Sequence, residues 1–285
     1  AEDGIRDVER SRGLGDVYKR QLLDRDNIES AIDASLSRLQ TDYIDVYQLH
    51  WPDRRMGNFG ADGLGYKHYE AETIPILETL KVLSDLVKAG KIRYIGLSNE
   101  TPWGLSEFIK YSEMLDLPRV VSVQNAYNFL NRTYELGMSE FHHRSQVGLL
   151  AYSPLAQGYL SGKYIDGARP KGARTTLFER GDRYEVPGAN EAVISYVNYA
   201  KSIGMDPSVM ANAFVNSRDF VTSNIIGATS MEQLKLAIAS IDVKLSEEDL
   251  KQIDLIHRSN PNTVSYTHLR AHETSLHLVC RLLLE

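Results

Sequence analysis

The chain has 285 residues, of which 42% are hydrophobic and 25% are charged, a composition typical of globular proteins. Its formal net charge of −6 argues against a surface for nucleic acid or anionic membranes, which needs clustered lysine and arginine. No apolar run reaches the roughly 20 residues that span a bilayer, and the first residues lack the apolar segment of a signal peptide. The single cysteine, Cys280, excludes an internal disulfide and favours a reducing, cytoplasmic location.

Segments with helical and strand-like patterns alternate along the chain. Apolar residues at helical spacing predict a helix over 27–39 with Asp26 or Asn27 as its N-cap, and a β-rich run over 43–50 closes at Trp51-Pro52. Gly-rich and polar residues predict loops over 54–71 and 156–188. Further helices are predicted at 74–88, 103–114, 191–203, 207–216 and 230–240, and further strands at 91–99, 120–125, 147–153 and 223–227.

Short apolar strands separated by helices predict βαβ units and therefore a parallel sheet. The strands are apolar without alternation, which indicates that both of their faces are covered. No glycine-rich dinucleotide fingerprint follows any of them. The pattern leaves open a (β/α)8 TIM-type barrel or a doubly wound sheet, and favours the barrel.

Polar groups follow four of these strands where each one ends. They are His50, Ser98-Asn99, Gln124-Asn125 and Tyr152-Ser153. Active sites of α/β barrels are built at this C-terminal edge from residues of several strands. One polar strand end is an ordinary cap, but four in succession indicate a site.

Several motifs together resemble the aldo-keto reductase family over residues 22–262. They are residues 39–45 with His50-Trp51-Pro52, then 90–99, 151–155, Gly162-Lys163, and 226–229 followed by Gln233. The long insert after Pro52 and residues 172–178 resemble the bacterial Tas-type branch of that family. The resemblance implies a barrel that binds NADP(H) in an extended pose and transfers a hydride to a carbonyl carbon.

The resemblance also implies the roles of individual residues. His50 would match the catalytic histidine that orients the carbonyl oxygen. Asn and Gln supply the donors and acceptors that a carboxamide needs, an aromatic face holds a planar ring, and a helix N-terminus after Gly227 attracts phosphate. The expected cofactor-binding residues, from the nicotinamide to the adenosine end, are Ser98, Asn99, Gln124, Tyr152, Ser153, Pro154, Leu155, Lys163, Arg174, Gly227, Thr229 and Gln233, and no metal is expected.

Structural roles remain open for some of these residues. Ser98 and Asn99 are also suitable caps for the next helix, Tyr152 is also a suitable core residue, and Arg174 either contacts cofactor phosphate or lies on a loop surface. The sequence departs from the family pattern at Leu236 and Ala237, where an acidic residue and an asparagine usually bind adenine. These two positions weaken the expectation of NADP over NAD.

The family's proton-transfer residues are a tyrosine, a lysine and an aspartate from the first three strands, and nothing before Asn27 matches them. Tyr18 and Lys19 are adjacent, so in a strand they would point to opposite faces. Residues 15–21 and 264–274 resemble translated sequencing-adaptor sequence. We therefore expect non-native extensions at 1–21 and 263–285, around a partial barrel domain at 22–262 that holds about five of eight strands.

The sequence thus predicts an NADP(H)-dependent oxidoreductase that reduces aldehydes or ketones to alcohols, with this fragment itself inactive. The alternative is a nucleotide-binding, non-catalytic interaction protein of the potassium-channel β-subunit type. Missing strands would leave unpaired sheet edges, so we expect this polypeptide to fold poorly or to associate. The sequence specifies neither the carbonyl substrate nor the oligomeric state.

Overall fold

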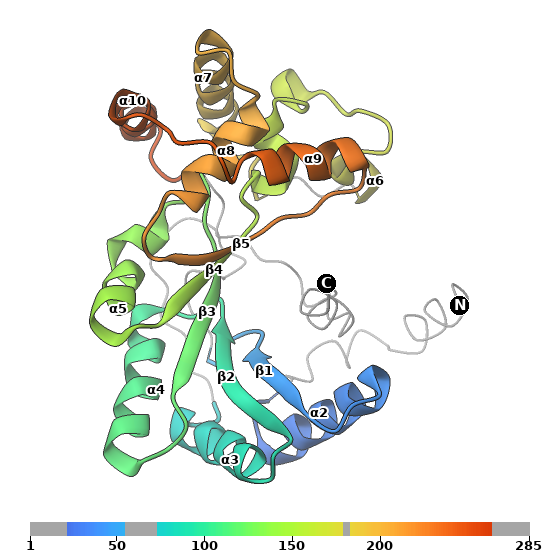
Figure 1. Ribbon diagram of the computed structural model, residues 1–285, viewed down its shortest axis with the longest axis vertical. Coiled ribbons are helices and arrows are strands. Elements are labelled where there is room, and N and C mark those ends of the chain that lie inside the picture. Colours follow the sequence, from blue (N-terminus) through green and yellow to red (C-terminus); the bar gives the residue numbers. More distant parts are fainter. Residues whose placement is uncertain (1–21, 55–72, 179–182, 264–285) are drawn as a thin grey trace.

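The computed structural model describes residues 22–54, 73–178 and 183–263. Within these ranges, the strands of one parallel sheet alternate with helices along the chain (Figure 1). The strands are β1 (Ile44–Leu49), β2 (Ile92–Ser98), β3 (Val120–Ala126), β4 (Gly148–Tyr152) and β5 (Val221–Ile225). The α-helices are α2 (Arg25–Leu39), α3 (Ile76–Lys88), α4 (Pro102–Leu115), α5 (Met138–Ser145), α6 (Arg174–Phe178), α7 (Ala189–Ser202), α8 (Pro207–Asn216), α9 (Met231–Ala239) and α10 (Glu247–Ser259), and the short 3-10 segments are η2 (Thr133–Leu136), η3 (Ala156–Ser161) and η4 (Ile165–Gly167).

The order of the strands distinguishes the two folds that the sequence left open. All neighbouring strands are parallel, and the order β1-β2-β3-β4-β5 is the order of the chain. A doubly wound sheet reverses its strand order at a switch point, and this sheet does not. Helices α3, α4 and α5 all lie on the outer side of the curved sheet (Figure 1). The arrangement is that of consecutive βα units of a (β/α)8 barrel.

The sheet has an outer face packed on helices and an inner face with polar groups. On the outer face, Leu97 and Val123 are buried in one apolar cluster with Leu83 and Phe108 of helices α3 and α4. On the inner face, Gly96 lies between neighbouring side chains, since a Cβ there would meet Gln48 Cγ at 2.7 Å. Any side chain at position 96 would therefore displace Gln48.

Most predicted elements are present, with small shifts of their ends. Helix α8 has the predicted bounds, and Gly90, which follows helix α3, has the positive φ of +73° that glycine commonly adopts after a helix. The N-cap of α2 is Asp24, whose carboxylate accepts from Asn27 N–H, so the predicted caps were wrong. Strand β5 begins and ends two residues before the predicted 223–227. Helix α10 was not predicted.

The segment 156–188 was predicted as a loop, but it contains short helical segments and buried side chains. Segments η3, η4 and α6 fall within it, and Tyr159, Tyr164 and Tyr184 are buried in the main apolar cluster. The predicted insert at 54–71, apart from Arg54, lies outside the described residues, as do Tyr18-Lys19 and Cys280. Among the helices that the structure describes, none is long and apolar enough to cross a membrane.

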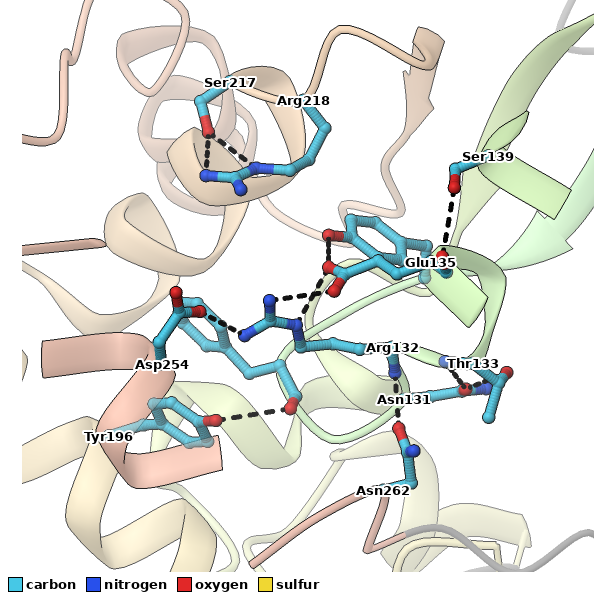
Figure 2. A network of polar contacts seen from close by, with 12 residues as sticks. Asn131, Arg132, Thr133, Glu135, Ser139, Tyr196, Ser217, Arg218, Asp254 and Asn262 are labelled. Carbon is cyan, nitrogen blue, oxygen red and sulfur yellow. Dashed lines mark hydrogen bonds and ion pairs between the residues drawn. The ribbon is translucent and has the colours of Figure 1, made fainter. Parts of the chain in front are cut away.

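A buried arginine joins the C-terminal helix to the segment that follows β3. The guanidinium of Arg132 donates to both carboxylate oxygens of Glu135 at 2.9 Å and to Asp254 of α10 at 2.7 Å (Figure 2). Its backbone N–H donates to Asn262 Oδ1 at 2.9 Å. The hydroxyl of Tyr127 donates to Glu135 as well. These bonds fix residues 127–136 against α10 and the segment that follows it.

Candidate active site

The predicted site residues of β2 and β3 lie beside one another at the C-terminal edge of the sheet. Ser98, the last residue of β2, is paired in register with Gln124 of β3. The Ser98 hydroxyl donates to the main-chain oxygen of Gln124 at 2.8 Å. The Gln124 side-chain amide has no hydrogen-bond partner among the described residues, which leaves it a free donor and a free acceptor.

Asn99 connects the ends of four strands. Its Nδ2 donates to the His50 carbonyl at 3.0 Å and to Ser98 Oγ at 3.3 Å. Its Oδ1 accepts from the Tyr152 hydroxyl at 2.7 Å, and its backbone N–H donates to the Gln124 carbonyl at 3.0 Å. The side chain is buried, and both of its donor hydrogens are used. Only one acceptor position, on Oδ1, remains for a ligand.

The backbone of Asn99 explains why this residue type occurs here. Its φ is +55°, in the left-handed region that asparagine tolerates better than most side chains. Ser153, directly after β4, has a φ of +57°. Strained backbone of this kind clusters at functional sites, because the surrounding contacts must hold it in place. Left-handed backbone also occurs at helix C-caps such as Gln40 and Asp116, so at Asn99 and Ser153 it is the position at neighbouring strand ends, with the bonds of Asn99, that supports a site.

His50 follows β1, and its imidazole is partly covered by protein while the residue as a whole remains open to solvent. Its side chain has no hydrogen-bond partner among the described residues, and its ring centroid lies 5.5 Å from that of Trp51. Desolvation by the surrounding protein lowers the pKa of His50 below 6.5. The imidazole is therefore neutral at pH 7 and carries one N–H donor, as a group that orients a carbonyl oxygen requires.

The turn after β4 brings together four of the predicted residues. Tyr152 ends the strand, Ser153 is left-handed, and Pro154 and Leu155 lead into η3. Lys163 folds back over η3, since its Nζ lies 2.9 Å from the place where a Cβ on Gly158 would stand. Its ammonium is also 5.2 Å from the centroid of the Tyr164 ring.

The residues predicted to bind the adenosine end of the cofactor form a separate group after β5. The backbone N–H and hydroxyl of Thr229 donate to Gln233 Oε1 at 2.9 Å and 3.1 Å. Ser230 caps helix α9, and Gly227 is exposed before it. No hydrogen bond between described residues joins this group to the Asn99 group. Arg174, on the short helix α6, is exposed.

Comparisons with known proteins agree with this architecture. Residues 13–258 match the aldo/keto reductase family. The chain belongs to the aldo/keto reductase family. It is 48% identical over 239 residues to protein Tas of Escherichia coli, which covers 84% of this chain and 68% of that protein. It is 38% identical over 251 residues to an aldo-keto reductase of Babesia bovis, covering 82% of this chain and 87% of that protein.

Membership gives the chain its coarse function. Aldo-keto reductases are oxidoreductases that act on small-molecule carbonyl compounds with a nicotinamide cofactor, and their fold is the (β/α)8 barrel. The five described strands are consecutive members of that barrel.

Two residues near the Asn99 group were missed by the sequence reasoning. Arg183 reaches Tyr152, with its NH1 3.4 Å from the phenol oxygen. Asn128, fully buried, donates to the Ser153 carbonyl at 2.9 Å. A signal for Asn128 was present in the spacing of three residues between Asn125, near the end of β3, Asn128 and Asn131. Arg183 lies in the segment read as a plain loop and gave no such signal.

Proposed function

We propose that the chain binds NADP(H) at the ends of β2, β3 and β4, and that its parent protein reduces aldehydes or ketones to alcohols. Two neighbouring side chains carry this proposal. The Gln124 amide has no hydrogen-bond partner among the described residues, and the Asn99 Oδ1 can accept one more hydrogen bond. A nicotinamide carboxamide has one carbonyl oxygen and one NH2 group, and these two side chains offer the complementary groups.

Each of the remaining residues has a defined task in this proposal. Tyr152 offers its ring as a stacking face, and its bond to Asn99 fixes the orientation of that ring. Lys163 and Ser153 would meet phosphate and ribose, and Pro154 and Leu155 would shape the turn. Gly227, Thr229 and Gln233 would hold the adenosine end, and Arg174 a phosphate. When bound, the cofactor supplies the hydride.

His50 would act on the substrate, not on the cofactor. A neutral imidazole donates one hydrogen bond to the carbonyl oxygen, which orients the carbonyl and stabilises the charge that develops on that oxygen. The resemblance places the family's proton-transfer tyrosine, lysine and aspartate before Asn27, where we expect no counterpart to them. We therefore propose that the 285-residue chain binds cofactor without turning over.

Titration of the chain with NADPH and with NADH tests the cofactor assignment. We expect saturable binding of NADPH, and we expect Gln124→Leu to weaken it about tenfold, since one lost hydrogen bond to a buried partner costs roughly 1–3 kcal/mol. Gln252→Leu is the matched control, because Gln252 lies on α10 and donates only to Glu248. Equal affinities in wild type and Gln124→Leu would contradict the proposed site. Tighter binding of NADH would reassign the cofactor, in line with Leu236 and Ala237.

Activity is tested on the chain joined to the N-terminal strands of an aldo-keto reductase. We expect steady NADPH oxidation with an aldehyde panel, and a lower kcat for His50→Ala. Unchanged turnover in His50→Ala would remove this residue from the mechanism. Tight NADPH binding by the joined protein without any turnover would instead favour a non-catalytic nucleotide-binding role.

A further inference from the structure

Asn128, in the segment after β3, has every hydrogen-bonding group of its side chain in use. The residue has no exposed surface. Its Oδ1 accepts from the backbone N–H groups of Leu130 at 2.9 Å and Asn131 at 3.0 Å. Its Nδ2 donates to the carbonyl of Ser153 at 2.9 Å and to the hydroxyl of Tyr184 at 3.1 Å. Two donors and two acceptors are therefore all satisfied, by three separate segments of the chain.

The group that Asn128 holds most directly is the strained turn after β4. Ser153 has a left-handed φ of +57°, which costs free energy for a residue with a Cβ. Such a conformation persists only where neighbouring groups hold it. Asn128 supplies one of two hydrogen bonds to the Ser153 carbonyl, the other coming from the backbone N–H of Ala156 within the same turn, and it is the one that ties the turn to another segment. The Asn128 bond therefore contributes to the direction in which the chain leaves β4 at Tyr152, together with the Tyr127 N–H bond to the Tyr152 carbonyl.

The segment that carries Asn128 is itself fixed from the other side. Asn131 Oδ1 accepts from the hydroxyl of Thr133 at 2.7 Å, and Arg132 is bonded to Glu135 and Asp254 (Figure 2). Asn128 and Asn131 also pair through their backbones in both directions. These bonds hold Asn128 in place independently of Ser153. A movement of Ser153 would therefore break its hydrogen bond to the Asn128 amide.

We propose that Asn128 is a positioning residue of the cofactor site. It fixes the left-handed turn at Ser153, and through that turn the Tyr152 ring and its hydrogen bond to Asn99. The inference rests on the proposed function, because the ring serves as a stacking face only if a nicotinamide binds there. Asn128 acts through Ser153 and has no contact with the ligand in this assignment.

Asn128→Asp separates this role from general stability. The carboxylate has nearly the shape of the amide and still accepts from Leu130 and Asn131, but it places an oxygen against the Ser153 carbonyl. We expect the Kd for NADPH to rise at least tenfold. The Kd for 2′,5′-ADP, which has no nicotinamide and reaches only the group after β5, should stay within about twofold of the wild-type value.

Asn212→Asp is the matched control. Asn212 is also buried, its Nδ2 donates to the Ser208 carbonyl at 3.0 Å, and its Oδ1 accepts from Asn224 Nδ2 at 3.2 Å. The substitution makes the same exchange of a donor for an oxygen against a carbonyl, on helix α8. It should lower the urea midpoint without changing the ratio of the two Kd values. Tyr184→Phe removes the other acceptor of Asn128 and should also leave the ratio near wild type.

The outcomes separate the possible failures. An unchanged NADPH affinity in Asn128→Asp overturns the inference, and so does an equal weakening of both ligands, which would indicate only a stability role. A wild-type chain that binds neither ligand overturns the proposed cofactor site, and the positioning role with it. If Asn128→Asp shows no cooperative unfolding, Asn128→Ser gives the same comparison, because its hydroxyl is too short to bridge the loop and Ser153.

Discussion

Replacement of Arg132 by methionine should cost about 2–4 kcal/mol of the free energy of unfolding. The methionine keeps the apolar contacts of the side chain but removes three hydrogen bonds to carboxylates. The Arg132 side chain is only 10% exposed, whereas those of Glu135 and Asp254 are 27% and 47% exposed. Breaking a fully buried ion pair costs roughly 3–5 kcal/mol, and a surface pair contributes about 0–1 kcal/mol. The two hydrogen bonds to Glu135 therefore account for most of the lost free energy of unfolding, and the bond to Asp254 for the smaller part.

Urea unfolding of both proteins measures this loss as a change in midpoint at constant m. Arg144→Met is the matched control, because Arg144 and Glu140 form an exposed pair one helical turn apart on α5. That variant should lose no more than about 0.5 kcal/mol. A loss below about 1 kcal/mol in Arg132→Met would refute the reasoning. It would mean that the carboxylates are solvated well enough without the arginine.

Two further predictions concern pH and the turn after β4. Burial and the charge of Arg132 lower the pKa of His257 below 6.5, so unfolded chains take up more protons and stability should decrease as pH falls through 6.5. His257→Gln should flatten this decrease, and a urea midpoint with unchanged pH dependence would contradict it. Gly158→Ala should cost about 1 kcal/mol or more and weaken NADPH binding severalfold, because φ is +100° and the new Cβ displaces Lys163. Gly167→Ala, at φ +76° with open space around it, is the control that should lose stability alone.

The regular elements were largely predictable because their signals are local. Asp206 and Pro207 mark the start of α8 with a capping carboxylate and a proline at the first turn, and both features are present in the structure. Helix α10 has an equally local signal, a capping box formed by Ser246 and Asp249, which the sequence reasoning did not use. The predicted bounds of β5 lay two residues too late in the chain. Its hydrogen-bonded pairing with β4 sets the bounds, and the apolar pattern of the sequence does not reveal that pairing.

The candidate site was predictable only as a set of strand ends. The positions of Ser98, Gln124 and Tyr152 follow from parallel strands that finish at one edge. Which hydrogen-bonding groups stay free at these strand ends does not follow, because the Asn99 side-chain amide is bonded to His50, Ser98 and Tyr152, and its backbone N–H to Gln124. The positive φ of Asn99 and Ser153 could not be predicted from the sequence either, since neither residue is a glycine.

The two sets of hydrogen bonds described above differ in how far along the chain they reach. Bonds that build the Asn99 group join residues 26, 49 and 53 apart, whereas those of Arg132 to Asp254 and Asn262 join residues 122 and 130 apart. Closing the longer loops costs roughly 1 kcal/mol more in chain entropy. On this ground we expect the strand ends to come together before α10 docks, which hydrogen exchange of α10 and of the strands would test. Release of the C-terminal helix would then remove the Asp254 and Asn262 bonds of Arg132 and loosen the segment that carries Asn128, while the direct bonds of Asn99 to His50 and Ser98 would remain.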